Sequence, residues 1–156
     1  MSFTLYLNSE RGQKTTIGST QSVQYNFNWS VLEEKSKYEL TFTFASRDIP
    51  AVNADDHYAI RLTGLGVLNN YTPTASSVAS SNEIIGMIHP QAVPLAAATG
   101  TTYYLYADTV TNPPVFIRQK PTGNNFRVEI VYLNDTGAYV INDEWVLILH
   151  FKKIKD

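Results

Sequence analysis

Strict alternation of apolar and polar residues is the feature that most constrains how this chain folds. In residues 23–29 and 38–44, every second residue is large and apolar, and the residues between are polar or small. Residues 126–132 and 145–151 also place a large apolar residue at every second position. A period of two residues is that of a β-strand with one buried face. No segment supports a helical period comparably, so the chain is predicted to be all-β.

Weaker strand signals bring the expected number of strands to about nine. These weaker strands are predicted at residues 3–8, 57–63, 83–89, 102–107 and 115–120. Segments rich in Gly, Pro, Asn and Ser separate the strands. A single helical turn is predicted at residues 30–35, where Ser30 precedes Glu33 in a capping-box arrangement. The longer connections are predicted at residues 45–56, 64–82 and 90–100.

The number of strands and the length of their connections favour one architecture. About nine short strands in 156 residues are typical of a two-sheet antiparallel sandwich. The connections are too long for a barrel made only of tight hairpins. We therefore expect a single jelly roll of about eight to nine strands, whose strands cross between two sheets, in one domain spanning residues 1–156.

The charge distribution argues against direct binding of nucleic acid. The formal net charge is −2, and the basic residues are scattered. The one basic cluster, Lys152, Lys153 and Lys155, is interpreted as a solvated tail. Phosphate neutralisation needs clustered Lys and Arg, so we expect no direct nucleic-acid partner.

The absence of cysteine excludes disulfides, thiolate metal sites and cysteine nucleophiles. No basic segment followed by a long apolar run opens the chain, so we expect neither a signal peptide nor a membrane span. Synthesis in a reducing, cytosol-like compartment follows from these two expectations.

Residues 135–138 (DTGA) follow an apolar run and spell the active-site motif of retroviral-type aspartic proteases. That mechanism needs two aspartates sharing one proton and a substrate cleft built from the chain that follows. Only residues 139–156 follow here, and the motif lies between two strand signals. Asn-Asp-Thr-Gly is good hairpin chemistry, so we interpret the segment as a turn.

No other set of residues predicts catalysis or metal binding. Asp55, Asp56 and His57 are adjacent donors, but neighbouring residues of a strand point to opposite faces and no spaced partner supports them. His89 and His150 have no nucleophile associated with them in the sequence. We therefore expect no catalytic residue, no metal ligand and no cofactor, and we do not expect an enzyme.

Two strands carry apolar residues on their second face as well as their first. In such strands the outer face must also be covered, either by a neighbouring subunit or by a long loop. Alternation also places Tyr104 and Tyr106 on one face of their strand, where aromatic side chains suit an interface. The candidate interface residues are Val131, Leu133, Val146, Ile148, Tyr104 and Tyr106.

Parts of the sequence resemble a family of viral proteins. Residues 3–9 (FTLYLNS), 25–30 (YNFNWS) and 38–46 (YELTFTFAS) are similar to the opening of small capsid-associated proteins of large double-stranded DNA viruses and virophages. Residues 128–133 (VEIVYL) and 145–151 (WVLILHF) are similar to the last strands of single jelly-roll capsid proteins. The resemblance covers about the first 46 and the last 35 residues.

The resemblance implies a structural role in the virion. The expected function is that of a penton-like, minor or accessory capsid protein, made in the host cytoplasm. It would assemble with itself as a pentamer or trimer and contact other capsid proteins. The alternative is a β-sandwich that binds a host glycan or receptor, such as a lectin-like or tumour-necrosis-factor-like head, because sandwich folds host many functions.

Overall fold

A computed structural model describes residues 2–17, 20–46, 57–68, 83–94, 101–108, 112–117, 120–132, 138–139 and 144–154. These ranges contain twelve strands and two short 3-10 turns, which confirms the predicted all-β class. The elements are β1 (Ser2–Asn8), η1 (Ser9–Arg11), β2 (Gln13–Ile17), β3 (Thr20–Asn26), η2 (Trp29–Val31), β4 (Tyr38–Ser46), β5 (Tyr58–Thr63), β6 (Val67–Leu68), β7 (Ile84–Pro94), β8 (Thr101–Ala107), β9 (Val115–Ile117), β10 (Asn125–Tyr132), β11 (Ala138–Tyr139) and β12 (Trp145–Lys153).

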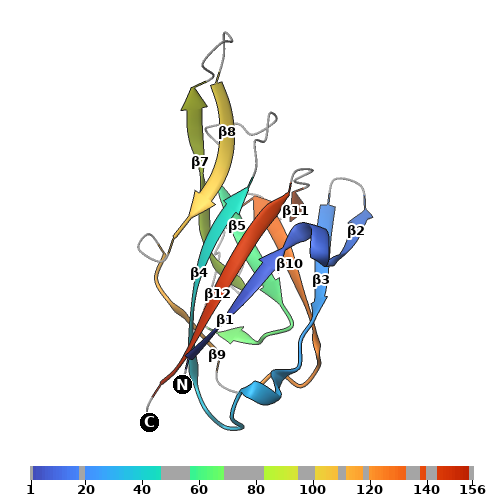
Figure 1. Cartoon of the computed structure of the whole chain (residues 1–156), viewed down its shortest axis with the longest axis vertical. Coiled ribbons are helices and arrows are strands. Elements are labelled where there is room, and N and C mark those ends of the chain that lie inside the picture. Colours follow the sequence, from blue (N-terminus) through green and yellow to red (C-terminus); the bar gives the residue numbers. More distant parts are fainter. Residues whose placement is uncertain are drawn as a thin grey trace, which may run out of the picture.

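Nine strands form one curled antiparallel sheet in the order β1-β12-β4-β8-β7-β5-β10-β3-β2. We call β1, β12, β4 and β8 the β4 half, and β5, β10, β3 and β2 the β5 half. The long strand β7 joins them, because its first part pairs with β5 and its second part pairs with β8. Figure 1 shows that the sheet curls until the two halves lie over one another.

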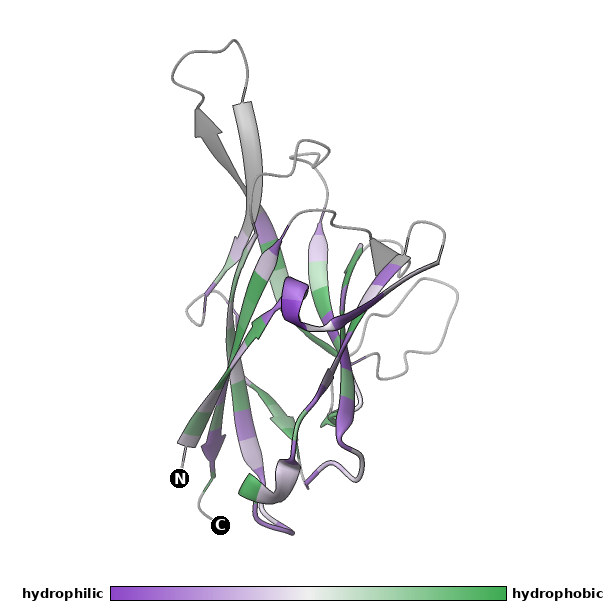
Figure 2. Cartoon of the chain, turned by 45° about the vertical axis from the view of Figure 1, so that its right-hand side comes forward, coloured by the Kyte–Doolittle hydropathy of each residue, from purple (hydrophilic) through white to green (hydrophobic). Residues whose placement is uncertain are grey.

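One apolar core lies between the two halves. The apolar positions of β4, from Tyr38 to Phe44, are at most 2% exposed, and those of β12 from Trp145 to Phe151 are also at most 2% exposed. Figure 2 shows the resulting bands of hydrophobic and hydrophilic residues along the strands. Trp29 connects the halves, since its ring lies 5.6 Å from Phe126 of β10 and 5.8 Å from Phe151 of β12, measured between centroids. Each such buried side chain contributes about 1.5–3 kcal/mol of transfer free energy.

The helical turn expected at residues 30–35 lies one residue earlier and is shorter. η2 spans Trp29–Val31, and its cap is Asn28, whose side-chain oxygen accepts from the Ser30 backbone N–H at 3.0 Å. Ser30 is therefore not the cap that the capping-box pattern predicted. The apolar alternation of residues 23–29 also continues beyond the strand itself. β3 ends at Asn26, and Trp29, which is buried in the core, belongs to the 3-10 turn η2.

The connection expected at residues 90–100 begins as a strand instead. β7 continues to Pro94, and its pairing with β5 shifts register at Ile60/Arg61, just before it passes from the β5 half to the β4 half. At this crossing the buried side chain of Asn112 takes the place of a neighbouring strand. Its Oδ1 accepts from the Met87 N–H at 2.8 Å, and its Nδ2 donates to the Met87 carbonyl at 2.9 Å.

Gly86 makes room for this arrangement. A Cβ at this position would lie 2.5 Å from both Asn112 Oδ1 and the ring of Phe42. Real Cβ atoms do not approach other atoms so closely, so a larger residue here would displace the amide of Asn112 or the aromatic core.

Three short or polar strands escape the alternation rule. β2 is a polar strand at the end of the sheet order, β6 lies inside an expected connection, and β11 pairs with β10 through Ile130 and Val131.

The basic residues interpreted as a tail are also structured in part. Lys152 and Lys153 belong to β12, and Lys153 Nζ donates to Glu33 Oε2 at 2.5 Å, which lowers the pKa of that carboxyl. Lys155 lies outside the described residues.

No helix of the described ranges is long and apolar enough to cross a membrane.

Removal of the Asn112 side-chain amide is expected to lower the stability of the fold. Asn112→Ala leaves the backbone N–H and carbonyl of Met87 without these two hydrogen bonds, and an unsatisfied buried polar group costs about 1–3 kcal/mol. We expect the free energy of unfolding, measured by urea denaturation, to fall by about 2 kcal/mol or more. Asn125→Ala, at an exposed site on β10, is the matched control and should change it by less than about 0.5 kcal/mol. Equal effects of the two substitutions would contradict the role given to Asn112.

Candidate interaction surface

The register of the β4 half brings residues from five strands into one row on its outer side. Val146 of β12 lies opposite Asn8 of β1 and Ala45 of β4. Ala45 lies opposite Tyr106 of β8, and Tyr106 lies opposite His89 of β7. Residues that are directly opposite in an antiparallel sheet share a face. This face is the outer one, because the residues next to Val146 along its strand, Trp145 and Leu147, are in the core.

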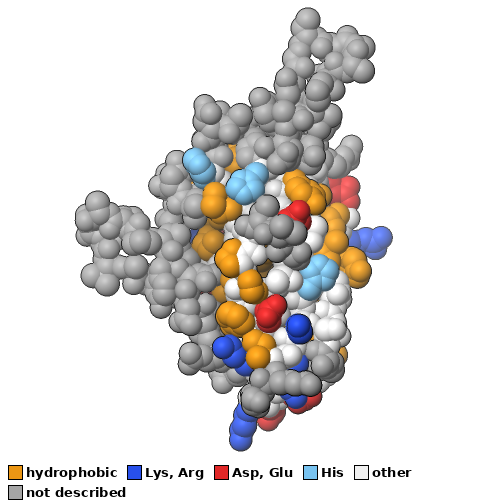
Figure 3. Space-filling view, turned by 90° about the vertical axis from the view of Figure 1, so that its left-hand side faces the viewer, with side chains coloured by type: hydrophobic (Ala, Val, Ile, Leu, Met, Phe, Trp, Pro, Cys, Tyr) orange, Lys and Arg blue, Asp and Glu red, His pale blue; other side chains and the backbone are white. Residues whose placement is uncertain are grey.

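A second row lies one pleat further along the same face. Ile148 is opposite Tyr6 of β1 and Thr43 of β4. The apolar members of the two rows form what we call the outer-face cluster: Tyr6, Ala45, Tyr106, Val146 and Ile148. Tyr6 is 75% exposed and Tyr106 is 37% exposed, and they are two of the three exposed large hydrophobic residues in the described part of the chain. Figure 3, which views the side where β4, β8 and β7 lie, shows hydrophobic side chains among polar and histidine side chains.

The outer-face cluster has a polar border. Beyond Ile148, His150 lies opposite Thr4 and Thr41, and His150 Nδ1 is 3.3 Å from Thr4 Oγ1. The next row pairs Lys152 with Glu39 across the strands. An apolar centre surrounded by polar and charged residues is the usual composition of a protein–protein interface.

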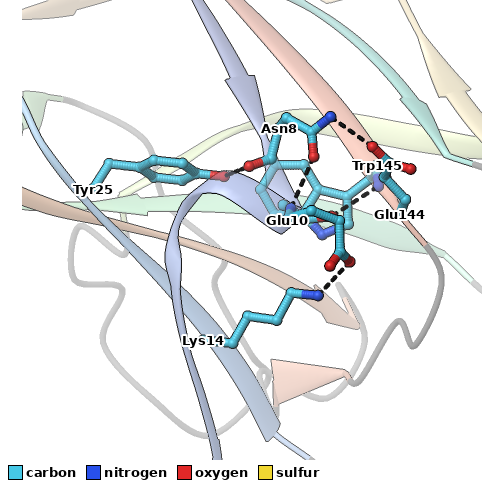
Figure 4. A network of polar contacts seen from close by, with 7 residues as sticks. Asn8, Glu10, Lys14, Tyr25, Glu144 and Trp145 are labelled. Carbon is cyan, nitrogen blue, oxygen red and sulfur yellow. Dashed lines mark hydrogen bonds and ion pairs between the residues drawn. The ribbon is translucent and has the colours of Figure 1, made fainter.

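A network of polar contacts holds the β1 end of this surface (Figure 4). Asn8 Nδ2 donates to Glu144 Oε1 at 2.6 Å, and Asn8 Oδ1 accepts from the Glu10 N–H at 2.8 Å. Lys14 forms an ion pair with Glu10.

Two further bonds attach this network to both halves of the sheet. The buried Ser9 hydroxyl accepts from the Trp145 N–H at 3.0 Å. Tyr25 of β3 donates its phenolic hydrogen to the Asn8 carbonyl at 2.7 Å, and burial raises the pKa of Tyr25, which keeps this donor protonated. The end of the strand that carries Tyr6 is therefore hydrogen-bonded to both halves of the sheet.

The structure brings together three of the six candidate interface residues. Val146, Ile148 and Tyr106 share the outer face of the β4 half, as the pairing above shows. Val131 does not join them, because β10 belongs to the β5 half and its Val131 is 1% exposed, packed with Ala59 and Ile84. The chain itself covers Val131, so this residue needs no neighbouring subunit. Leu133 lies outside the described residues, and only the backbone of Tyr104 is described.

Sequence reasoning missed Tyr6 and Ala45 as members of the surface. Tyr6 stands between the apolar residues Leu5 and Leu7, so β1 is apolar on both faces in the same way as β12. That signal was present in the sequence. The contribution of Ala45 follows only from its pairing with Val146, which the sequence does not reveal.

The residues considered for chemistry do not converge where the structure describes them. No group of three His, Asp or Glu that could hold a metal ion occurs in the described ranges. His57 lies at the exposed start of β5, His89 at the exposed crossing of β7, and His150 on the outer face of β12. Asp55, Asp56 and residues 135–137 lie outside the described ranges. The strands on either side of residues 135–137, β10 and β11, pair antiparallel, with Val131 opposite Ala138.

Because Tyr6 of the outer-face cluster is 75% exposed, it should contribute little to the stability of a single chain. Tyr6→Thr keeps a residue with a high strand propensity, and we expect it to change the free energy of unfolding by less than about 0.5 kcal/mol. Tyr25→Phe removes the hydrogen bond to the Asn8 carbonyl and should cost about 1 kcal/mol. Urea denaturation at a concentration where the chain is monomeric measures both. If Tyr6→Thr lowered the free energy of unfolding as much as Tyr25→Phe, Tyr6 would be a residue that stabilises the fold.

Comparison of the sequence with protein-family models and with curated proteins finds no match. The resemblance of the two ends of the chain to capsid proteins therefore stays a prediction.

Proposed function

We propose that this chain is a single jelly-roll capsid protein that acts by self-assembly and by contacts with other capsid proteins, and not by catalysis. The observation that carries the proposal is the strand order. When the edge strand β2 and the short strands β6, β9 and β11 are set aside, the other eight strands fall into two sets of four neighbours, β1-β12-β4-β8 and β7-β5-β10-β3. In this order the first strand lies next to the last, and the chain passes repeatedly between the sets. This order supports a jelly roll, a fold found in viral capsid and lectin domains.

Three of the five segments that resemble capsid proteins lie together in space. They contain β1, β4 and β12, which are neighbours in the β4 half. These same strands supply Tyr6, Ala45, Val146 and Ile148 of the outer-face cluster. Four of the five residues of the outer-face cluster therefore lie in segments with the resemblance, which supports a role for this face in assembly.

Association through this face would be driven by the removal of apolar surface from water. A stable interface buries roughly 800 Å² and about 20–30 residues of each partner, which is more than the five residues of the outer-face cluster. Closed rotational symmetry supplies the difference, because every copy in a ring contacts two neighbours and no interface is left unused. A pentamer or a trimer, located in the capsid, satisfies this requirement.

Ile148→Lys is the direct test of this proposal. A lysine at the centre of the outer-face cluster would place an unpaired charge in the interface, while its long side chain can reach solvent in a single chain. We expect native mass measurement to show a five-fold or three-fold assembly for the original chain and monomers for the variant. Circular dichroism should show the same β-sheet signal for both.

Ser22→Lys is the matched control, because Ser22 is half-buried on the outer side of the β5 half, opposite Glu129. It should leave the assembly intact. Assembly that persists in Ile148→Lys would remove the outer-face cluster from the interface. A chain that stays monomeric and binds a sugar would favour the lectin-like alternative, for which the exposed ring of Tyr6 beside Thr4 and Asn8 would be the binding surface.

A further inference from the structure

The strand β1 forms one edge of the curled sheet, and half of its backbone groups face no partner strand. Within the described ranges β1 pairs only with β12, and β2 forms the other edge of the sheet. In an antiparallel ladder, successive residues direct their N–H and carbonyl groups to alternate sides of the strand. Every second residue of β1 therefore faces away from β12, on the side where a further strand can pair.

Two hydrogen bonds identify the residues that face this open side. The Trp145 N–H points toward the β1 side, because it donates to the hydroxyl of Ser9, directly after β1. In the next pair, Val146 and Asn8, the backbone groups point the other way, so those of Asn8 face away from β12. The Asn8 carbonyl accepts from the Tyr25 hydroxyl at 2.7 Å, as this direction requires. The residues of β1 that face the open side are Ser2, Thr4, Tyr6 and Asn8.

β1 lacks the features that protect the edge strands of natural sheets. Protected edges are short, carry charges or proline, or are interrupted by a bulge. β1 is seven residues long, contains no proline and no charged residue, and pairs with β12 without a shift of register. By contrast, β2 is polar and carries Lys14, and its residues 13–16 are exposed. Of the two edges, β1 is therefore the one suited to the addition of a strand.

A second copy of β1 fits this edge in one full-length register. The open backbone groups meet, and the outward side chains stay on one face, when an even-numbered residue lies opposite an even-numbered one. The antiparallel register centred on Leu5 meets this condition and includes all seven residues of each strand. It places Leu5 opposite Leu5 of the second copy on the core side, and Thr4 opposite Tyr6 of the second copy on the outer side.

The same register brings opposite charges together at both ends of the strand pair. The exposed Lys152 lies opposite Ser2, which in this register lies opposite Asn8 of the second copy. Asn8 binds the carboxylate of Glu144 at 2.6 Å (Figure 4). Two strand spacings, about 10 Å, separate the Lys152 backbone from that Asn8, a distance that the long lysine and glutamate side chains span. In the part of the chain that the structure describes, neither Lys152 nor Glu144 forms an ion pair.

We propose that β1 of one copy pairs antiparallel with β1 of a second copy, across a two-fold axis at Leu5. The two β4 halves then form one continuous sheet, and Lys152 of each copy pairs with Glu144 of the other. Such a contact is self-complementary, because both copies contribute the same surface. It goes beyond the ring proposed above, which uses the outer face of the sheet and not its edge. The paired strands are smaller than the roughly 20–30 residues a side of a stable interface, so single chains pair only weakly.

Disulfide trapping detects a weak contact of this kind, and the natural absence of cysteine makes it specific. Directly opposite residues have Cα atoms about 4.5–5.5 Å apart, within the range that a disulfide spans. We expect Leu5→Cys, oxidised under mild conditions, to form disulfide-linked dimers. Phe3→Cys is the matched control, because Phe3 is also half-buried on the core side but lies four residues, roughly 14 Å along the strand, from Phe3 of the second copy. Equal linking of the two variants, or no linking of Leu5→Cys, would overturn the proposed pairing.

A second pair of cysteines keeps the test independent of the core. Thr4→Cys mixed with Tyr6→Cys places the two thiols opposite each other on the outer face, where neither substitution removes a core side chain. We expect these two variants, made with different masses, to link mainly to each other. Mixed dimers no more frequent than dimers of identical chains would contradict the register.

Ile148→Lys separates the edge contact from the ring. Linked Leu5→Cys dimers in the Ile148→Lys chain would support the edge contact without any contribution from the outer-face cluster. Five-fold or three-fold rings that give no linked dimers would overturn the edge contact and leave the proposed function in place. Linked dimers from an original chain that forms no ring would overturn the ring and leave the edge contact in place.

Charge reversal tests the ends of the strand pair. Lys152→Glu and Glu144→Lys each place like charges together in a dimer of identical chains, whereas a mixed dimer of the two variants restores both ion pairs. In the Leu5→Cys background at low salt, we expect about three-fold more mixed dimers than dimers of identical chains, and about 1 M salt should remove this preference. Equal numbers of the two kinds of dimer at low salt would overturn the pairing of Lys152 with Glu144.

Discussion

The packing of aromatic rings between the two halves of one curled sheet determines the rest of this structure. Trp29 touches Phe126 from one half and Phe151 from the other, and all three are at most 2% exposed. A strand that buries such a ring on one side must present its alternate residues on the other side. The outward positions of Val146, Ile148 and Tyr6 are therefore consequences of what their strands bury.

The two faces of the β4 half have different roles: the inner face stabilises the fold, and the outer face is proposed to bind other chains. The core side carries the residues whose burial favours folding, and the outer side carries an uncharged cluster between polar borders. Hydrogen bonds from Asn8 and Ser9 to β12 and its flank keep the edge strand in place without covering that cluster. Because the backbone of β1 is already fixed by its pairing with β12, little backbone entropy is lost when the cluster binds.

The sequence predicted the strand content well and the surface in part. Alternation located the core strands, because burial on one face leaves a period of two that a reader can count. It missed β2, whose residues are polar, and it extended β3 to Trp29, where a 3-10 turn capped by Asn28 performs the same burial. The pattern placed Val131 and Val146 in one set of candidate interface residues, because each lies in a strand that is apolar on both faces. Only the pairing of strands distant in sequence shows that they lie on different halves.

The continuity of β7 has a mechanical consequence. One unbroken strand runs from its ladder with β5, past the Asn112 amide, to the projecting end that pairs with β8. A pull on that end acts along the strand and loads the β5 ladder in shear, so several hydrogen bonds resist together. Tension on that end would thus be carried by a single backbone into the other half of the sheet.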